Sequence, residues 1–133
     1  MAQLLEHKHL IVQATVKNPP KDPAYIEQWT KELVEAIGMK IAKGPIAFYS
    51  TMEGNVGLTC MTIIETSHIA LHVFEDANPC LLEFDLYTCS TLDVQQVLKF
   101  LDEFQPLEVY YMFLDREFDL TVTETGRRVR GAK

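Results

Sequence analysis

Residues 56–75 read VGLTCMTIIETSHIALHVFE, and this stretch decides the fold. Thr, Ile, Val and Leu dominate it, a composition typical of β-strands. The pattern predicts two strands, over residues 57–65 and 68–75, that meet around Thr66-Ser67. Two strands joined by so short a connection run antiparallel. The stretch therefore predicts an antiparallel hairpin in the middle of the chain.

The second of these strands alternates between apolar residues and histidines. Successive side chains along a strand point to opposite faces of the sheet. Ile69, Leu71 and Val73 therefore share the face that is expected to meet the core. His68 and His72 lie together on the opposite face, which the core does not cover.

A strand and a helix are predicted before this hairpin. The strand covers residues 8–16 and ends at the breaker Asn18-Pro19-Pro20. Asp22-Pro23 then has the form of a helix cap followed by a proline at the first helical position. Apolar residues at three- and four-residue spacing predict an amphipathic helix that ends at Gly38.

The remaining elements repeat this mixture of strands and one helix. Ser90 or Thr91 is expected to cap a second helix, whose apolar stripe is Val94, Val97, Leu98, Leu101 and Phe104. The other predicted strands cover residues 39–51, with an interruption near Gly44-Pro45, residues 80–89, residues 107–114 and, more weakly, residues 118–124.

Successive strands with short turns, and two helices with one apolar stripe each, predict a two-layer α+β sandwich. We expect one antiparallel sheet with both helices on one face, as a single domain over residues 1–133. The other face carries the apolar candidates Phe48, Tyr87, Tyr110 and Met112. A second copy of the chain could bury it, so we expect a homodimer with the layers αββα.

Composition narrows the classes of function. The chain has 133 residues, with 12 Lys+Arg against 19 Asp+Glu and a net charge of −7. Such a surface repels phosphate backbones, so we expect no nucleic-acid partner. The sequence contains neither a signal peptide nor an apolar run that could span a membrane, and its three cysteines have no metal-binding or disulfide spacing. A reduced, cytoplasmic protein is expected, with a solvated basic tail over residues 126–133.

Two familiar chemistries fit the histidines poorly. His68 and His72 lie about 13 Å apart on a strand and cannot bind one metal ion together, so no metal site is expected. Ser67, His72 and Asp85 supply the residue types of a hydrolase triad, but the sequence lacks the GxSxG turn and gives no geometry for them.

Two motifs taken together point to one protein family more specifically than either chemistry above. Residues 66–72, TSHIALH, are followed by residues 84–89, FDLYTC. This pair of motifs resembles the small prokaryotic S-adenosylmethionine decarboxylases, which are pyruvoyl enzymes of polyamine (spermidine) biosynthesis. The early strand histidine, His9, and the two helices fall in the family's order, so the resemblance covers most of the chain.

The resemblance implies that the chain makes its own cofactor. Ser67 would attack the carbonyl of Thr66, and the resulting ester would be eliminated and hydrolysed. The zymogen would thereby split between Thr66 and Ser67 and leave a pyruvoyl group derived from Ser67. The family's pattern assigns His72 as the base that removes the α-proton, and Thr59 as the processing hydroxyl that stabilises the oxyanion.

The resemblance also assigns the decarboxylation. The pyruvoyl group would form a Schiff base with the substrate amine and act as an electron sink. Cys89 would return a proton after the loss of CO2. Phe74 stands where the family usually has tryptophan, and Glu75 or Asp76 near its glutamate, so these residues are expected to contact a cationic substrate.

Several positions depart from the family's pattern and leave the substrate open. Thr66 replaces the usual glutamate before the cleavage serine, and Thr59 replaces a serine. The stretch 52–56 carries Glu53 but no aromatic ring for stacking adenine. Three readings follow: an S-adenosylmethionine decarboxylase, a pyruvoyl decarboxylase of ornithine or arginine, or an unprocessed homologue that binds a ligand or partner without catalysis.

Overall fold

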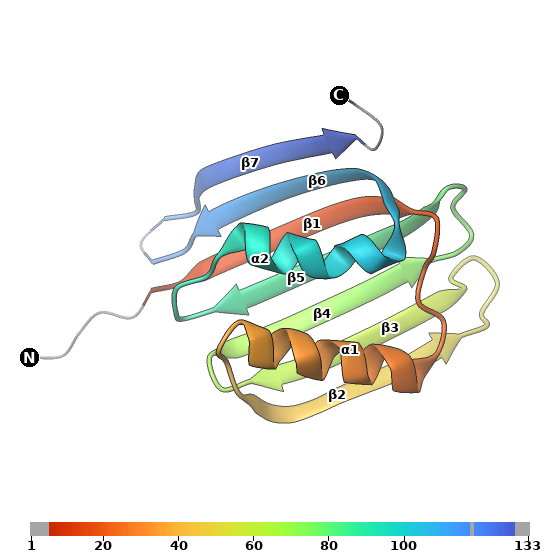
Figure 1. Ribbon diagram of the computed structural model, residues 1–133, viewed down its shortest axis with the longest axis horizontal. Coiled ribbons are helices and arrows are strands. Elements are labelled where there is room, and N and C mark those ends of the chain that lie inside the picture. Colours follow the sequence, from red (N-terminus) through yellow and green to blue (C-terminus); the bar gives the residue numbers. More distant parts are fainter. Residues whose placement is uncertain (1–5, 118, 130–133) are drawn as a thin grey trace, which may run out of the picture.

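Seven antiparallel strands form one sheet, and the two helices lie over one of its faces (Figure 1). The computed structural model describes residues 6–117 and 119–129. The strand order is β2-β3-β4-β5-β1-β6-β7, so the N-terminal strand is inserted beside β5 and β6. The strands are β1 Lys8–Val16, β2 Ile41–Ser50, β3 Gly57–Ile64, β4 Ser67–Phe74, β5 Cys80–Thr88, β6 Pro106–Asp115 and β7 Thr121–Val129; the helices are α1 Pro23–Ala36, α2 Val94–Phe100 and the short 3-10 helix η1 Leu101–Phe104.

The predicted two-layer α+β architecture is confirmed, and so is the start of the first helix. The Asp22 side chain accepts a hydrogen bond from the Ala24 backbone N–H at 3.1 Å, and Pro23 opens α1. The expected interruption near Gly44-Pro45 does not break β2. It is a register shift between Lys43 and Ile46 within one continuous strand.

The predicted cap of the second helix was wrong. The cap is Asp93, whose Oδ1 accepts hydrogen bonds from the N–H groups of Gln95 at 3.1 Å and Gln96 at 3.4 Å. Ser90 instead pairs with Thr88, whose Oγ1 lies 3.0 Å from its hydroxyl. A carboxylate at the N-terminus of a helix also interacts favourably with the helix dipole, which favours Asp93 over a hydroxyl two or three residues earlier.

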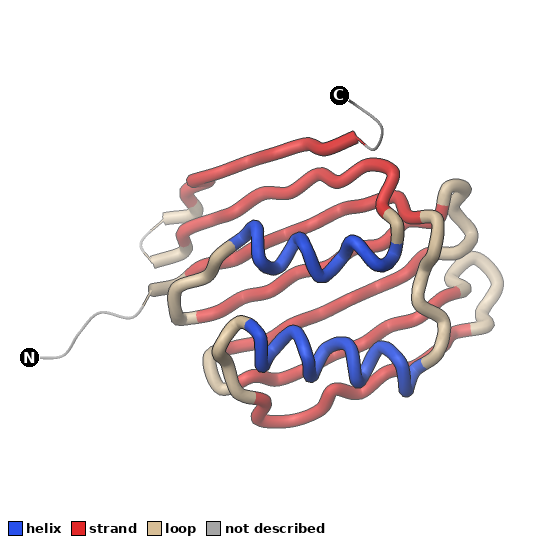
Figure 2. Tube along the Cα trace, viewed as in Figure 1, coloured by secondary structure: helices blue, strands red, loops and turns tan. Residues whose placement is uncertain are grey.

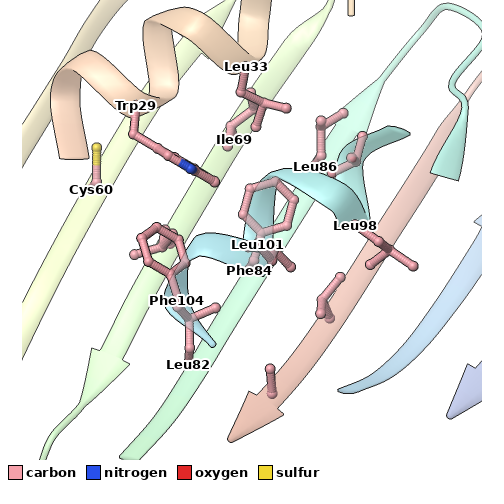
Figure 3. Close-up of a cluster of buried hydrophobic side chains, with 14 of the residues drawn as sticks. Trp29, Leu33, Cys60, Ile69, Leu82, Phe84, Leu86, Leu98, Leu101 and Phe104 are labelled. Atoms are coloured by element: carbon pink, nitrogen blue, oxygen red, sulfur yellow. The ribbon is translucent and has the colours of Figure 1, made fainter. Parts of the chain in front are cut away.

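The core lies between the helices and the sheet, and Trp29 of α1 packs inside it (Figure 3). Its indole N–H donates to the Phe100 carbonyl at 3.1 Å. Its ring meets Phe84 of β5 edge-on, at a centroid distance of 6.2 Å, and Phe104 of η1 at 5.3 Å. One aromatic side chain therefore ties α1, the sheet and the α2–η1 segment together.

The alternation predicted for β4 is confirmed. Ile69, Leu71 and Val73 are at most 3% exposed and face the helices. We call the opposite side of the sheet the open face, because no helix of the described residues covers it (Figure 1). Three of the four predicted apolar residues there, Phe48, Tyr110 and Met112, are more than 40% exposed. Phe48 is the most exposed of them at 66%, while the fourth, Tyr87, is half-buried.

The last strand extends further than predicted. β7 runs to Val129, so residues 126–129 of the expected solvated tail belong to the sheet, while residues 130–133 lie outside the described part of the chain. Gly126 lets the Tyr111 ring lie directly against the β7 backbone, since an added Cβ would come within 2.3 Å of that ring. Arg127 pairs with Glu108 on β6 at 3.1 Å.

Different turns lie at the two ends of the strands (Figure 2). At one end, the β3–β4 turn lies beside the segment that leaves β5. At the other end, the β2–β3 turn lies beside the β4–β5 turn, because the Val56 N–H donates to Asp76 Oδ2 at 3.0 Å. No helix in the described residues is long and apolar enough to cross a membrane.

The close contact of β3 with β4 yields a test of the fold. Gly57 has φ of +143°, and a Cβ there would lie 2.0 Å from the Val73 carbonyl oxygen. We expect Gly57→Ala to lower the free energy of unfolding by more than about 2 kcal/mol, measured by urea denaturation. Gly54→Ala is the matched control, since Gly54 has φ of +83° but open space around it. An equal loss in both variants would contradict the steric explanation.

Candidate active site

The predicted cleavage point is a two-residue turn between β3 and β4. Ile64 and Ser67 are the last paired residues of the hairpin, so Glu65 and Thr66 form the turn. The Glu65 N–H donates to the Lys40 carbonyl at 2.8 Å. The Cys89 N–H donates to the Thr66 carbonyl at 2.9 Å. Backbone donors and acceptors from two other segments therefore fix the Thr66–Ser67 peptide.

Ser67 has an unusual backbone conformation. Its φ is +148°, which glycine adopts readily and other residues rarely. Such conformations cost about 1–3 kcal/mol and persist where the surrounding structure enforces them. Here the β3–β4 and β4–β5 pairings enforce it, since Ser67 is in register with Ile64 and with Thr88. The peptide before Ser67 is thus held in place on a strained residue.

Thr59 and His72 form a second group, on the open face. They are direct partners across β3 and β4, and Thr59 Oγ1 lies 3.2 Å from His72 Nδ1. The Phe74 ring lies 6.3 Å from the His72 ring, centroid to centroid. A hydroxyl and an imidazole within hydrogen-bonding distance can pass a proton between them.

The acidic residues expected to meet the substrate lie at the end of the sheet away from Ser67. Asp76 accepts the Val56 N–H and thereby links two turns. Glu75 accepts a hydrogen bond from the Tyr49 hydroxyl at 3.0 Å and lies 3.9 Å from the Lys21 ammonium. Its other carboxylate oxygen is buried without a partner in the described residues. Glu53 is exposed in the β2–β3 turn.

One chain therefore carries the expected site in two separate groups. Thr66, Ser67 and Cys89 lie together at one end of the strands. His72 is five residues beyond Ser67 on β4, a separation of about 16 Å, and its side chain follows the opposite phase of the strand. Thr59 lies with His72, and Phe74, Glu75, Asp76 and Glu53 lie further still from Ser67.

A hydrogen-bonded network surrounds Asp85 beside the first group. His9 Nε2 and His68 Nε2 each lie 3.2 Å from the same oxygen, Asp85 Oδ1. Arg116 NH1 lies 3.0 Å from His9 Nδ1. Burial acts to raise the pKa of Asp85, but its hydrogen bonds with His9 and His68 outweigh this effect, so that the pKa is lowered. Asp85 is accordingly an ionised acceptor held between two imidazoles.

In the described part of the chain, one set of ligand atoms lies close enough together for a metal ion. It belongs to His9, His68 and Asp85, whose ligand atoms are within 4.8 Å of one another. The tautomer of His9 argues against that use. A guanidinium only donates, so His9 Nδ1 accepts from Arg116 and the ring proton sits on Nε2. A metal-bound imidazole must offer a lone pair at the ligand atom and usually donates from its other nitrogen. The geometry fits hydrogen bonding to a carboxylate better than metal binding.

Sequence reasoning missed Arg116 altogether. Its guanidinium carbon lies 4.2 Å from the centre of the Tyr87 ring, and its backbone N–H donates to the His7 carbonyl at 2.7 Å. Arg116 follows β6 while His9 is on β1, so no local pattern connects them. Only the register of β1 with β6 indicates that the two residues meet.

Comparison with solved structures agrees with this fold. A structure titled as the adenosylmethionine decarboxylase from Aquifex aeolicus is similar to the chain, with a TM-score of 0.63 and 17% sequence identity. The similarity covers 94% of this chain and 99% of that one. At such identity it shows a shared fold only. No curated protein sequence matches the chain.

A family model is more specific. The model described as S-adenosylmethionine decarboxylase matches residues 8–117, which include both sequence motifs and every strand from β1 to β6. Because this match covers most of its length, the chain belongs to the S-adenosylmethionine decarboxylase family.

Proposed function

We propose that this chain is a pyruvoyl-dependent decarboxylase that makes its cofactor by splitting between Thr66 and Ser67. One observation carries the proposal: the Cys89 N–H lies 2.9 Å from the Thr66 carbonyl oxygen. That oxygen would gain negative charge if Ser67 attacked the carbonyl. A donor already aimed at the oxygen stabilises this charge without reorganisation.

The residues present suit that first step. Ser67 Oγ bonds to the Thr66 carbonyl carbon while the carbonyl electron pair moves to the oxygen beside the Cys89 N–H. The C–N bond then breaks, its electrons go to the Ser67 nitrogen, and this nitrogen takes the proton that the hydroxyl gave up. An ester and a free amine result. Relief of the φ of +148° at Ser67 favours breaking this bond.

The same end of the sheet suits the decarboxylation. Once formed, the pyruvoyl group would supply the electron sink that loss of CO2 needs. The backbone contact with Thr66 brings Cys89 beside the position of this group, and we assign its thiol the return of a proton to the substrate.

The separation of Thr59 and His72 from Ser67 supports a site shared between two copies. A two-fold axis through facing sheets would bring the Ser67 end of one chain toward the His72 end of its partner. The open face has the apolar surface for such a contact, since Ile46 is 70% and Phe48 is 66% exposed. His72 of the partner would then remove the α-proton of Ser67, with Thr59 beside it.

The reading that names S-adenosylmethionine as substrate follows from the family, but one observation favours ornithine or arginine. Glu53 is exposed in the β2–β3 turn, at the same end of the strands as Phe74, and residues 52–56 offer no ring to stack on adenine. A carboxylate there suits an ammonium or guanidinium group. A small cationic amino acid is thus the second candidate substrate.

The splitting is tested by intact mass under denaturing conditions. We expect the purified wild-type chain to give two fragments that meet between Thr66 and Ser67, the second of them with a pyruvoyl terminus. Ser67→Ala should give one full-length mass, because no hydroxyl remains to attack. An unsplit wild-type chain after prolonged incubation would instead favour the non-catalytic homologue.

Cys89 has a backbone role in splitting and a thiol role in turnover, and one substitution separates them. Cys89→Ala keeps the N–H that contacts Thr66, so the chain should still split to completion. Turnover should fall by about 100-fold or more, the usual contribution of a positioned acid. Carbon dioxide release from S-adenosylmethionine, ornithine and arginine measures it. A variant that fails to split but remains folded would contradict the assignment.

Mixed dimers test the shared site. His72→Ala and Ser67→Ala chains should each stay intact when expressed alone. Expressed together, the His72→Ala chain should split, because its Ser67 meets the His72 of the other chain. Tags of different mass distinguish the two chains. Splitting of the His72→Ala chain by itself, or no splitting in the mixture, is the contrary result.

A further inference from the structure

One cation and one anion on the open face have no charge partner within the described residues. They are Arg116, which is exposed, and Glu83, which is half-buried, and neither takes part in an ion pair there. Arg127 differs, because its guanidinium is 3.1 Å from the Glu108 carboxylate. Arg116 and Glu83 are therefore free to pair with groups outside their own chain.

Arg116 is held in a defined position over the Tyr87 ring. Its backbone N–H is bonded to the His7 carbonyl, and NH1 donates to His9 Nδ1. Its guanidinium carbon is 4.2 Å from the Tyr87 ring centre. A stacked guanidinium keeps the N–H groups along its edge available. Arg116 is thus a fixed cation that can still donate two parallel hydrogen bonds to a carboxylate.

Glu83 lies on the same face as Tyr87, toward the other end of β5. Its neighbours Leu82 and Phe84 are at most 2% exposed and belong to the core, so the alternation along the strand directs Glu83 to the open face. The four-residue separation of Glu83 from Tyr87 is about 13 Å along a strand. This distance agrees with the absence of an ion pair between Glu83 and Arg116 in the described chain.

The arrangement of two copies proposed above brings these two groups together. In it, the Ser67 end of β4 faces the His72 end of the partner's β4, so the two-fold axis crosses the strands and each strand faces its own copy in the antiparallel direction. Tyr87 of β5 is in register with His68 of β4, and Glu83 is in register with His72. Tyr87 of one copy, with the guanidinium stacked on it, therefore faces Glu83 of the other.

Distance and charge both suit a contact between these side chains. Facing sheets lie about 10 Å apart, and opposed side chains fill the space between them. The guanidinium already lies over the Tyr87 ring and so stands in that space. The other carboxylates of β5 and β6 have partners in their own chain; they are Asp85, Glu108 and Asp115. Within the described part of these two strands, Glu83 is the carboxylate left to meet a cation.

We propose that Glu83 of one copy forms an ion pair with Arg116 of its partner, twice in a two-fold dimer, an inference that rests on the shared site proposed above. The two pairs neutralise cations that a covering sheet would otherwise bury unpaired. They also fix the register in which the open faces meet, because a slip along the strands separates both pairs. The Ser67 end of each chain is thereby held against the His72 end of the other.

Charge reversal tests the pair by sedimentation equilibrium, with all variants made in the Ser67→Ala chain so that every copy is unsplit. We expect the parent chain to be a dimer. Arg116→Glu and Glu83→Arg should each raise the Kd of the dimer by at least about 100-fold, because like charges then face each other. An equimolar mixture of the two variants should dimerise again, since one pair is then as in the wild type and the other has its signs exchanged.

Neutral variants give a second measurement that does not introduce a repulsion. Arg116→Gln and Glu83→Gln should each raise the Kd at least about tenfold, and the double variant should lose no more than either alone, because both remove the same pair. Arg127→Gln is the matched control, since Arg127 is paired with Glu108 in its own chain, and it should change the Kd by less than about threefold.

Three results would overturn the proposal. They are a monomeric parent chain, single variants that dimerise as tightly as the parent, and a mixture of the two reversed chains that stays monomeric although circular dichroism shows both to be folded. Because the measurement uses an unsplit chain, its outcome is separate from the intact-mass measurement that decides the pyruvoyl chemistry.

Discussion

The period of two along β4 is the constraint on which the rest of the structure depends. Burial of Ile69, Leu71 and Val73 under the helices commits His68, His72 and Phe74 to the open face. A shift by one residue would exchange the two sets and destroy both the core and the site. The same rigid strand separates Ser67 from His72 by about 16 Å, so no side-chain rotation can bring them together. Packing of the core is thus the reason why the proposed function takes His72 from a second copy.

The geometry of the turn bears on the departure from the family at Thr66. The usual residue there is glutamate, but the contact at the cleavage point uses the carbonyl of residue 66 and the backbone N–H of Cys89. Neither group depends on the side chain at position 66. The Thr66 hydroxyl instead lies 3.7 Å from Met39 Sδ, away from Ser67. A backbone donor and a strained serine can therefore serve the same acyl shift with a different side chain beside them.

The sequence predicted correctly those elements whose structure depends on neighbouring residues. The alternation in β4 and the Asp22-Pro23 helix start depend on neighbouring residues and could be predicted. The second cap could not, because Ser90, Thr91 and Asp93 compete within four residues, and the Thr88–Ser90 contact depends on the end of β5. The two-group arrangement of the site and the Arg116–His9 contact depend on strand register, which joins residues that are far apart in sequence.

Charge decides which parts of the open face can be covered by another sheet. Asp85 Oδ1 has both histidines as hydrogen-bond partners, so this oxygen would keep its partners if a second sheet excluded water from it. Arg127 has Glu108. Arg116 differs, because covering its guanidinium would cost several kcal/mol unless an anion came with it. A dimer whose interface buried Arg116 would therefore have to bring an anion to it, whereas an interface that left Arg116 in solvent would not.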